Sequence, residues 1–433
     1  MATHNTAGLS RREMLAALGV AGCSLSGWLG ALARAAGDPQ RKRSCILLWM
    51  AGGPSQMDTF DLKPGHVNGG PLKEIATAVP GVRISEHLPQ LAKQAGRVAV
   101  IRSMSTKEGD HGRATYHLRT GYVQQAPIDY PPLGAALAKE LGQPDADLPG
   151  FISIAPGRGV SPAAYGGGFL GPRYAPLMVG SESEAGGERA LKVQDVSPPS
   201  GVRKAQADAR IGLLDGLDRA FVARHPDPGP RSQQAAFEGA VRLMKPAAAR
   251  AFDLDEEKKE LRDQYGRSLF GQGCLLARRL VERGVPFVEV ALGGWDTHVG
   301  NFDAVKRLSA VLDPGWATLL ADLDQHGLLD TTLVVWMGEF GRTPQDNGQA
   351  GRDHYPGAWT TVLAGGGIKG AQVVGKTSKD GTAVEDRPVP VPDFMATVCR
   401  ALGVDPTTQN ISNVGRPIRI ADKAAHPIKE VLA

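Results

Sequence analysis

The sequence predicts an α/β fold in which a mainly parallel sheet is covered by helices on both faces. The 433 residues are 42% hydrophobic and 22% charged, which is ordinary globular composition and excludes a wholly disordered chain. Short apolar runs bounded by turn residues alternate with amphipathic stretches of helix length, as in strand–helix–strand units. The predicted strands are Cys45–Met50, Val98–Met104, Phe151–Ala155, Pro286–Leu292, Thr332–Met337 and Thr360–Ala364.

The predicted helices lie between and after these strands. The longest, Asp255–Arg283, carries apolar residues near a 3.6-residue spacing with charges on its other face. The segments Gly180–Gly187 and His225–Ser232, rich in glycine or proline, predict loops or linkers, and we expect a mostly helical insertion at about 203–259. The other predicted helices are Pro132–Leu141, Arg203–Arg224, Gln233–Leu243, Phe302–His326 and Val391–Leu402.

Charge and cysteine content exclude two classes of protein. The 49 basic and 45 acidic residues give a net charge of +4, which is too balanced for a nucleic-acid binder. We therefore expect no nucleic-acid partner. The four cysteines lie far apart in the sequence, so they provide neither a disulfide framework nor a cysteine-based zinc site.

Residues 1–35 carry the pattern of a twin-arginine export signal. Arg11 and Arg12 stand directly before an uncharged, glycine- and alanine-rich stretch, and small residues suited to cleavage precede Ala36. The pattern predicts a mature chain of residues 36–433, forming one domain with the helical insertion. It also predicts passage through the twin-arginine export machinery to the periplasm or the cell exterior.

Two other fates of this N-terminal segment stay open. The sequence ending at Cys23 is similar to a lipobox, and processing there would leave a protein anchored to a membrane through a lipid on Cys23. The uncharged stretch is also long enough to act as a membrane anchor, although its glycines and serines make a poor spanning helix. Soluble export is the first of the three expectations.

Four of the predicted strands run directly into polar, glycine-rich turns. In a parallel sheet the carboxyl ends of the strands share one edge, and ligands bind there in open α/β folds. We therefore expect the turns to converge on a shared site. They comprise residues 52–61, 105–113, 293–298 and 338–343, the last followed by 351–355.

The turns supply carboxylates and imidazoles but no thiolate, which suits a divalent metal such as Zn, Mn, Mg or Ca. Taken alone, each of these residues is weak evidence for a metal, because acids often cap a turn or a helix and a histidine can simply satisfy a buried hydrogen bond. Their grouping after four strands is what predicts a common site. The candidate metal ligands are Asp58, Asp61, His111, Asp296, His298, Glu339, Asp353 and His354.

Arginines stand beside the same turns. The forked donors of Arg113, Arg342 and Arg352 match the oxygens of phosphate or sulfate. A metal and arginines at one edge would suit Lewis-acid hydrolysis of an anionic ester.

Five motifs together resemble domain-of-unknown-function family 1501, whose members are exported bacterial proteins related to the alkaline phosphatase and sulfatase superfamily. The resemblance covers nearly the whole mature chain and implies an alkaline phosphatase/sulfatase-like sandwich, while the family has no assigned reaction. The motifs are Gly52-Gly53-Pro54-Ser55-x-x-Asp58-Thr59-Phe60-Asp61, Asp110-His111-Gly112-Arg113-Ala114, Gly293-Gly294-Trp295-Asp296-Thr297-His298, Gly338-Glu339-Phe340-Gly341-Arg342-Thr343 and Gly351-Arg352-Asp353-His354.

The wider superfamily implies roles for several of the candidate ligands. It implies an acidic ligand after the first strand, here Asp58 or Asp61, and an Asp and a His after a later strand, similar to Asp296 and His298. Many members then have Asp-His or Asp-Asn followed by glycine. This chain has Glu339-Phe340-Gly341, so Glu339 keeps the ligand while Phe340 does not, and His354 is placed to complete the set.

The same resemblance leaves the nucleophile open. Sulfatases carry Cys or Ser nine residues before the Thr-Gly that ends the first catalytic helix, and phosphatases use Ser or Thr there. Counting back from Thr120 lands on His111. His111 is then a metal ligand or an unusual nucleophile, or Ser105 or Thr106 serves, or water attacks directly, or catalysis has been lost.

Two functions follow from these patterns. The first is an extracytoplasmic metal-dependent hydrolase acting on a phosphate or sulfate ester, for example of a polysaccharide or a lipid. In it His111, Arg113 and Arg342 are the candidate catalytic residues, with an arginine stabilising the developing charge. The second is a catalytically inactive pseudoenzyme of the same fold that serves as an extracytoplasmic binding protein, which the missing nucleophile and Phe340 favour.

Overall fold

The computed structural model describes residues 43–433 except 144–145, 181–189, 192 and 194–198. The predicted export signal, the lipobox and most of the predicted linker Gly180–Gly187 lie outside the described residues. Within the described part of the chain, no helix has the length and apolar character needed to cross a membrane.

An eight-stranded sheet lies at the centre of the structure, in the strand order β12-β4-β11-β8-β1-β7-β5-β6. Strand β11 runs antiparallel to β4 and β8, and all other neighbouring pairs are parallel, so the prediction of a mainly parallel sheet is confirmed. The strands are β1 (Ser44–Met50), β4 (Val98–Met104), β5 (Phe151–Ile154), β6 (Leu177–Val179), β7 (Phe287–Leu292), β8 (Thr332–Met337), β11 (Trp359–Gly365) and β12 (Gln372–Val374).

The two edge strands, β6 and β12, are not among the predicted strands. Each is three residues long, which is too short to produce a recognisable apolar run. The other six strands match the predicted ones to within a residue or two, because each is an apolar run buried on both faces.

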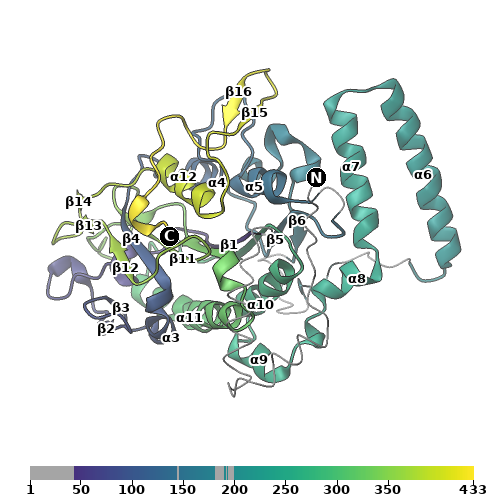
Figure 1. Ribbon diagram of the computed structural model, residues 1–433. Helices are drawn as coiled ribbons and strands as arrows, with labels where there is room; N and C mark the ends of the chain where they lie inside the picture. Colours follow the sequence, from purple (N-terminus) through teal and green to yellow (C-terminus); the bar gives the residue numbers. More distant parts are fainter. Residues whose placement is uncertain (1–42, 144–145, 181–189, 192, 194–198) are drawn as a thin grey trace, which may run out of the picture. The chain divides into compact units, whose positions relative to one another are not determined.

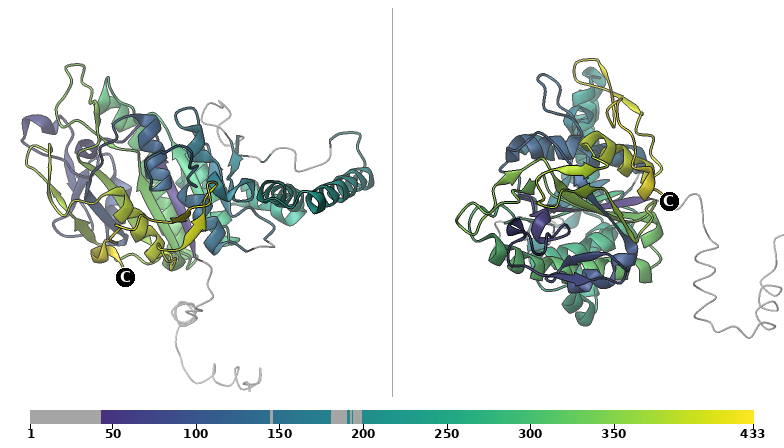
Figure 2. Two further views of the ribbon diagram at one scale, coloured as in Figure 1. Left: turned by 90° about the horizontal axis from the view of Figure 1, so that it is seen from above. Right: turned by 90° about the vertical axis from the view of Figure 1, so that its left-hand side faces the viewer.

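Helices cover both faces of this sheet, as Figures 1 and 2 show. Alternate residues of β1 separate into two apolar layers: Ile46 and Leu48 pack with α10 (Leu269–Glu282) and α11 (Asn301–Gln325). Cys45, Leu47 and Trp49 belong to the opposite layer, which holds residues of α5 (Leu133–Leu141), α12 (Val391–Ala401) and α4 (His111–Thr120). The predicted sandwich is therefore confirmed.

In the described part of the chain, the other strands form four two-stranded sheets. One of them matters for the candidate site, because it pairs β9 (Gly341–Arg342) with β10 (His354–Tyr355) and sets His354 opposite Arg342. The others are β2 (Glu74–Ala76) with β3 (Arg83–Ser85), β13 (Lys376–Thr377) with β14 (Val384–Asp386), and β15 (Gln409–Ile411) with β16 (Pro417–Arg419).

The remaining α-helices are α3 (Pro89–Lys93), α6 (Lys204–Arg224), α7 (Pro228–Leu243), α8 (Pro246–Ala249) and α9 (Lys259–Gln264). Helices α6 and α7 lie side by side in Figure 1 and account for most of the segment in which we predict a helical insertion. Helix α7 begins inside the predicted loop His225–Ser232, so that prediction is wrong over its second half. Prolines at the start of a helix need no amide hydrogen bond, which is why Pro228 begins this helix instead of preventing it.

The prediction of one long helix at Asp255–Arg283 is wrong. The segment contains a short turn of 3₁₀-helix (Leu254–Glu256), then α9, then α10. Gly266 takes a φ of +81° between α9 and α10, and the Ser268 hydroxyl accepts a hydrogen bond from the amide of Gly271 at 3.0 Å. A positive φ and a new N-cap end one helix and start another, although the apolar spacing continues through both.

Candidate metal centre

The carboxyl ends of the strands place the candidate site along one edge of the sheet. Strand β7 leads to Asp296 and His298, β8 leads to Glu339, and β4 leads to the loop before α4, which begins with His111. His354 reaches the same place from β10. The structure therefore brings together the turns that the sequence predicts to converge.

Helix α4 holds His111 at its first residue. The Asp110 side chain accepts a hydrogen bond from the amide of Arg113 at 3.0 Å, which caps the helix at its start. The helix ends at Thr120, and Gly121 follows with a φ of +79° in the left-handed region. The two caps fix where the helix begins, and so they fix the place of the His111 backbone.

Glu339 fixes the ring of His111. The Nδ1 atom of His111 lies 2.7 Å from Oε1 of Glu339, whose side chain is 3% exposed. The same oxygen accepts a hydrogen bond from the amide of Gly52 at 2.9 Å. An ionised carboxylate only accepts hydrogen bonds, so Nδ1 of His111 carries a proton and Nε2 keeps its lone pair when the ring is neutral.

His354 and His298 repeat this arrangement. Nδ1 of His354 lies 2.8 Å from the carbonyl oxygen of Gly109, and Nδ1 of His298 lies 2.7 Å from Oδ1 of Asp353. Both partners are acceptors, so each Nδ1 again carries a proton and each neutral ring directs the lone pair of Nε2 elsewhere. Histidines that bind metals show the same outer hydrogen bond to a carboxylate or a carbonyl.

The three Nε2 atoms converge on Asp296. Its Oδ2 lies 3.3 Å from Nε2 of His111, and its Oδ1 lies 3.0 Å from Nε2 of His298 and 3.2 Å from Nε2 of His354. Ligand atoms of His111, Asp296 and His354 all lie within 4.8 Å of one another.

Two of these three Nε2 atoms also lie close to each other. Nε2 of His298 and Nε2 of His354 are only 3.0 Å apart, and in neutral rings both would present lone pairs to each other and to the carboxylate of Asp296. Lone pairs repel at this distance unless a cation or a proton lies among them. The donor set therefore fits a metal ion with nitrogen and oxygen ligands.

Burial and neighbouring charges shift the pKa values of this centre. Burial alone would raise the pKa of Asp296, but the hydrogen bond and charge of Arg342, with help from His111 and His354, lower it to about 2. Burial alone would lower the pKa of His111, and the hydrogen bonds and charges of Glu339 and Asp296 raise it overall. The carboxylate of Asp296 is thus ionised at neutral pH and attracts cations.

Arg342 holds the surrounding loops together. Its side chain is fully buried, and it donates to Oδ1 of Asp296 at 2.6 Å, to the carbonyl of Gly53 at 3.0 Å, and to those of Arg352 and Gly52. The donors Nε, Nη1 and Nη2 are all engaged with these acceptors. Arg342 is therefore bound within the protein, in contact with a candidate ligand.

Two further residues shape the centre, and sequence reasoning gave neither this role. Phe340 is buried, and its ring centroid lies 4.9 Å from that of His111 and 4.7 Å from that of His354, so it supports both imidazoles. Gly52 has a φ of +111°, and a Cβ there would come within 2.3 Å of the amide nitrogen of Asp296. The Gly-Gly pair after β1 was the available signal of a close approach, whereas nothing in the sequence marks Phe340 as a packing residue.

The other predicted site residues lie around this centre or apart from it. Asp353 lies at the edge of the centre and binds the ring of His298. The carboxylate of Asp58 is buried against Arg352, 2.8 Å from its Nε. It also accepts hydrogen bonds from Ser55 and Asn301. Asp61 pairs with Lys63 at 2.9 Å and accepts from Thr377. Arg113 has a side chain 64% exposed and pairs with Glu108 at 2.8 Å. The structure thus gathers His111, Asp296, His298, Glu339, Asp353 and His354, and it gives Asp58 and Asp61 other partners.

Comparison with solved structures finds weak likeness over most of the chain. The PsFucS1 sulfatase from Pseudoalteromonas sp. is 15% identical over 88% of this chain and 70% of that chain, with a TM-score of 0.38. The lipoteichoic acid synthase LtaP from Listeria monocytogenes is 8% identical over 88% and 74%, with a TM-score of 0.42. A protein in the alkaline phosphatase superfamily from Vibrio parahaemolyticus is 13% identical over 84% and 67%, with a TM-score of 0.37.

Comparison with curated protein sequences finds no match. A match does occur to the family described as "Protein of unknown function (DUF1501)", and it extends over residues 42–432. The five motifs quoted above all fall within this range, so the resemblance that they indicate is confirmed and the chain belongs to the DUF1501 family.

Proposed function

We propose that this protein is a metal-dependent hydrolase whose metal is held by His111, Asp296 and His354, with His298 as a further ligand. The observation that carries the proposal is the convergence of three Nε2 atoms on one carboxylate, each ring having its Nδ1 proton bound to an acceptor. Imidazole-rich sets favour zinc over magnesium or calcium, which prefer oxygen ligands. Of the four metals that the sequence allows, zinc fits this donor set best.

The residues around the ligands orient them. Glu339, Asp353 and the carbonyl of Gly109 each fix one imidazole, and Arg342 fixes Asp296. These roles make Glu339 and Asp353 partners of the ligands, where the sequence had suggested direct ligands. Asp58 is not included in the proposed set, because its oxygens are already bound by Arg352, Ser55 and Asn301.

The centre is open to solvent, which favours catalysis over a purely structural role. The side chains of Asp296 and His298 are 46% and 42% exposed, whereas structural zinc sites are closed by their ligands. A zinc ion held there would polarise an ester oxygen and lower the pKa of an attacking water. Both ring nitrogens of His111 face carboxylates, so we assign it to holding the metal and not to nucleophilic attack.

The proposed substrate is an anionic phosphate or sulfate ester. The motif resemblance supports this class, and so does the exposed guanidinium of Arg113, two residues after His111. Contact between Arg113 and the substrate anion stays a prediction. Arg342 is assigned a positioning role, because its donors are engaged within the protein.

One observation favours a second candidate, a metal-binding protein without turnover. The position at which the resemblance implies a hydroxyl or thiol nucleophile is occupied by His111, and the buried Arg342 already donates from all three of its side-chain nitrogens to groups of the protein. Such a protein would use the same centre to bind an anionic ligand at the cell surface.

Metal analysis followed by an activity screen separates these candidates. Full-length protein, purified and loaded with zinc, manganese, magnesium or calcium in turn, would be assayed on aryl phosphate, aryl phosphodiester and aryl sulfate esters. The hydrolase proposal expects tight zinc binding and hydrolysis that stops when a chelator removes the zinc. Zinc binding with no turnover of any ester supports the binding protein, and failure to bind any of the metals contradicts both.

We also propose that the chain is exported by the twin-arginine route. The support is the sequence of residues 1–35, in which Arg11 and Arg12 precede the uncharged stretch. Replacing both with lysine should keep the protein in the cytoplasm, as fractionation would show. Export that continues unchanged in this variant contradicts the route, and lipid labelling that depends on Cys23 would identify the anchored alternative.

A further inference from the structure

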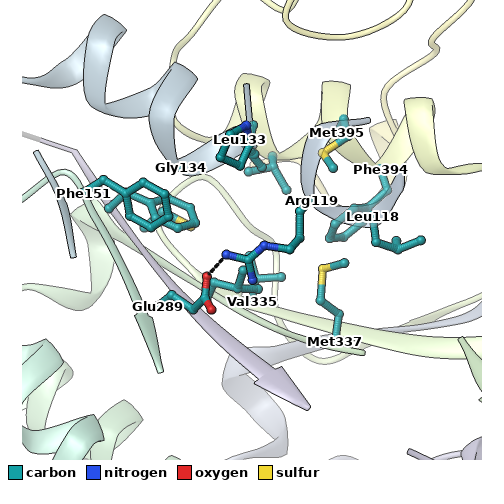
Figure 3. A pocket seen from close by; sticks show the side chains of 15 residues that line it. Leu118, Arg119, Leu133, Gly134, Phe151, Glu289, Val335, Met337, Phe394 and Met395 are labelled. Carbon is teal, nitrogen blue, oxygen red and sulfur yellow. Dashed lines mark hydrogen bonds and ion pairs between the residues drawn. The ribbon is translucent and has the colours of Figure 1, made fainter. Parts of the chain in front are cut away.

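A buried ion pair links the helix of one proposed ligand to the strand of another. Arg119 lies near the end of α4, which begins with His111, and Glu289 lies on β7, which leads to Asp296. The guanidinium of Arg119 donates to the Glu289 carboxylate, and the two side chains are 2% and 0% exposed. Figure 3 shows the pair between the sheet and the helices above it.

The pair also touches the central strand. The guanidinium carbon of Arg119 lies 5.4 Å from the ring centroid of Trp49 on β1 and 3.9 Å from that of Tyr165, and its Nε donates to the carbonyl of Ala164 at 3.0 Å. Trp49 stands three residues before Gly52, whose amide donates to Glu339. One guanidinium therefore contacts, directly or through its neighbours, the elements that lead to His111, Asp296 and Gly52.

A small void lies in the layer of side chains that holds α4 against the sheet. A cavity of about 20 Å³ lies beside the pair, lined mainly by apolar side chains that include Leu118, Leu133, Phe151 and Met395. Among the described residues, Nη1 of Arg119 and Oε1 of Glu289 have no hydrogen-bond partner. In this mainly apolar layer the ion pair is a directional contact between α4 and β7, which apolar packing does not supply.

A contribution to the stability of the fold does not by itself explain this pair. Removing two charges from water costs about as much free energy as their attraction returns, and apolar residues of similar volume often replace such pairs without loss. In some proteins buried polar groups of this kind serve to fix one geometry. Here the geometry is the separation of His111 from Asp296.

We infer that the Arg119–Glu289 ion pair is a positioning device that holds α4 against β7 and so sets the distance between His111 and Asp296. Arg119 and Glu289 touch neither the metal nor the substrate, and they act through the elements that carry the ligands. The consequence for metal affinity rests on the proposed function, whereas the positioning itself does not.

The test replaces the pair with apolar residues, in the double variant Arg119→Met with Glu289→Leu. Zinc affinity would be measured by competition with a chelator, and the melting temperature would be measured without metal. The Nδ1 proton of His111 would be followed by NMR in metal-free, ¹⁵N-histidine-labelled protein, and assigned by its absence in His111→Gln. We expect the melting temperature to stay near that of the wild type, the zinc affinity to fall about 10–100-fold, and the His111 proton signal to broaden or disappear.

A matched control is the buried pair Arg278–Asp322 between α10 and α11, with both side chains 3% exposed and 3.0 Å between Nε and Oδ2. Arg278→Met with Asp322→Leu should leave zinc affinity and the His111 signal unchanged, whatever it does to stability. If the Arg119–Glu289 double variant fails to fold, the variant Arg119→Lys tests the positioning claim in its place, since it keeps the charge and loses the forked donor. We expect it to weaken zinc binding and broaden the His111 signal to a smaller extent.

The inference is overturned if the folded double variant keeps the wild-type His111 signal, or, where that variant does not fold, if Arg119→Lys keeps it. If the wild type itself binds no zinc, the proposed function fails, and the His111 signal still decides the positioning claim. A wild-type zinc affinity with a lost signal would show that the pair positions His111 without controlling the metal, and that result would overturn the stated consequence.

Discussion

The Nδ1 atom of His111 lies 2.7 Å from Oε1 of Glu339, although 228 residues separate them in the sequence. This contact joins the helix after β4 to the turn after β8, and it fixes which nitrogen of His111 faces Asp296. The hydrogen bond gives the ring a defined tautomer and makes Nε2 a stronger ligand. Several testable consequences depend on it and on the contacts around it.

Glu339→Gln should weaken zinc binding without removing the site. The amide still fills the space, but it loses the charge that supports the ring of His111, and outer partners of this kind are worth about 10–100-fold in metal affinity. Titration with a competing chelator would measure the effect. Glu260→Gln on the exposed surface of α9 is the matched control, and equal affinities in the two variants would contradict the role of Glu339.

Asp296→Asn should abolish stoichiometric zinc binding and any zinc-dependent hydrolysis. Each of the three imidazoles has its Nε2 near this carboxylate, and an amide supplies neither its charge nor its second acceptor oxygen. Metal content would be measured after dialysis. The exposed Asp330, which precedes β8 at the opposite edge of the sheet, gives the control Asp330→Asn, and that variant should keep its zinc. Full zinc content in Asp296→Asn would rule out the proposed ligand set.

Zinc affinity should rise with pH and then level off. A ligand imidazole must be neutral to bind metal, and the pKa of His111 is raised above its ordinary 6.5 by Glu339 and Asp296, against the effect of burial. Protons therefore compete with zinc until the pH exceeds this raised pKa. In metal-free protein the sign for stability is opposite: protonated His111 stabilises the fold fully below pH 6.5, and this contribution is lost as the pH rises through the raised value. Calorimetric titration at several pH values would test the first trend, and a flat profile would contradict it.

Asp58→Ala should destabilise the fold while the centre keeps its ligands. The change leaves the guanidinium of Arg352, which is 1% exposed, without its charged partner, and such losses cost about 3–5 kcal/mol. Urea unfolding of the metal-free protein would give the free energy of unfolding. Lys63→Ala should cost less, because Asp61 keeps the hydrogen bond from Thr377 and the charge of Arg102, whose Nε lies 3.9 Å from its Oδ1. A stable Asp58→Ala protein that no longer binds zinc would instead make Asp58 a ligand.

The fold was predictable where local pattern and tertiary environment agree. Strand β8 is an apolar run ended by glycine, and such runs identify strands buried on both faces. The predicted helix Asp255–Arg283 failed because the turn at Gly266 interrupts a spacing that continues on both sides of it. Helix α4 is absent from the periodicity-based predictions because polar Arg119 and Thr120 lie on its buried side, where a core helix would show apolar residues.

The sequence predicted which turns would lie near one another at the site, but not which partner each side chain would bind. The carboxyl ends of parallel strands meet at one edge, so the turns with Asp296, His298 and Glu339 had to be near one another. Whether an acid binds a metal, an imidazole or a guanidinium depends on which side chains face it across the sheet. Asp58 faces Arg352, and the sequence carries no sign of that pairing.

The most direct test of the metal centre is anomalous diffraction at the zinc absorption edge, from crystals of the wild-type protein loaded with zinc. We predict one strong peak at about 2.0–2.2 Å from Nε2 of His111, Nε2 of His354 and the carboxylate of Asp296, with Nε2 of His298 as a further ligand. A structure in which zinc is absent there, and the imidazoles keep protons on Nε2 that bind Asp296, would contradict the account.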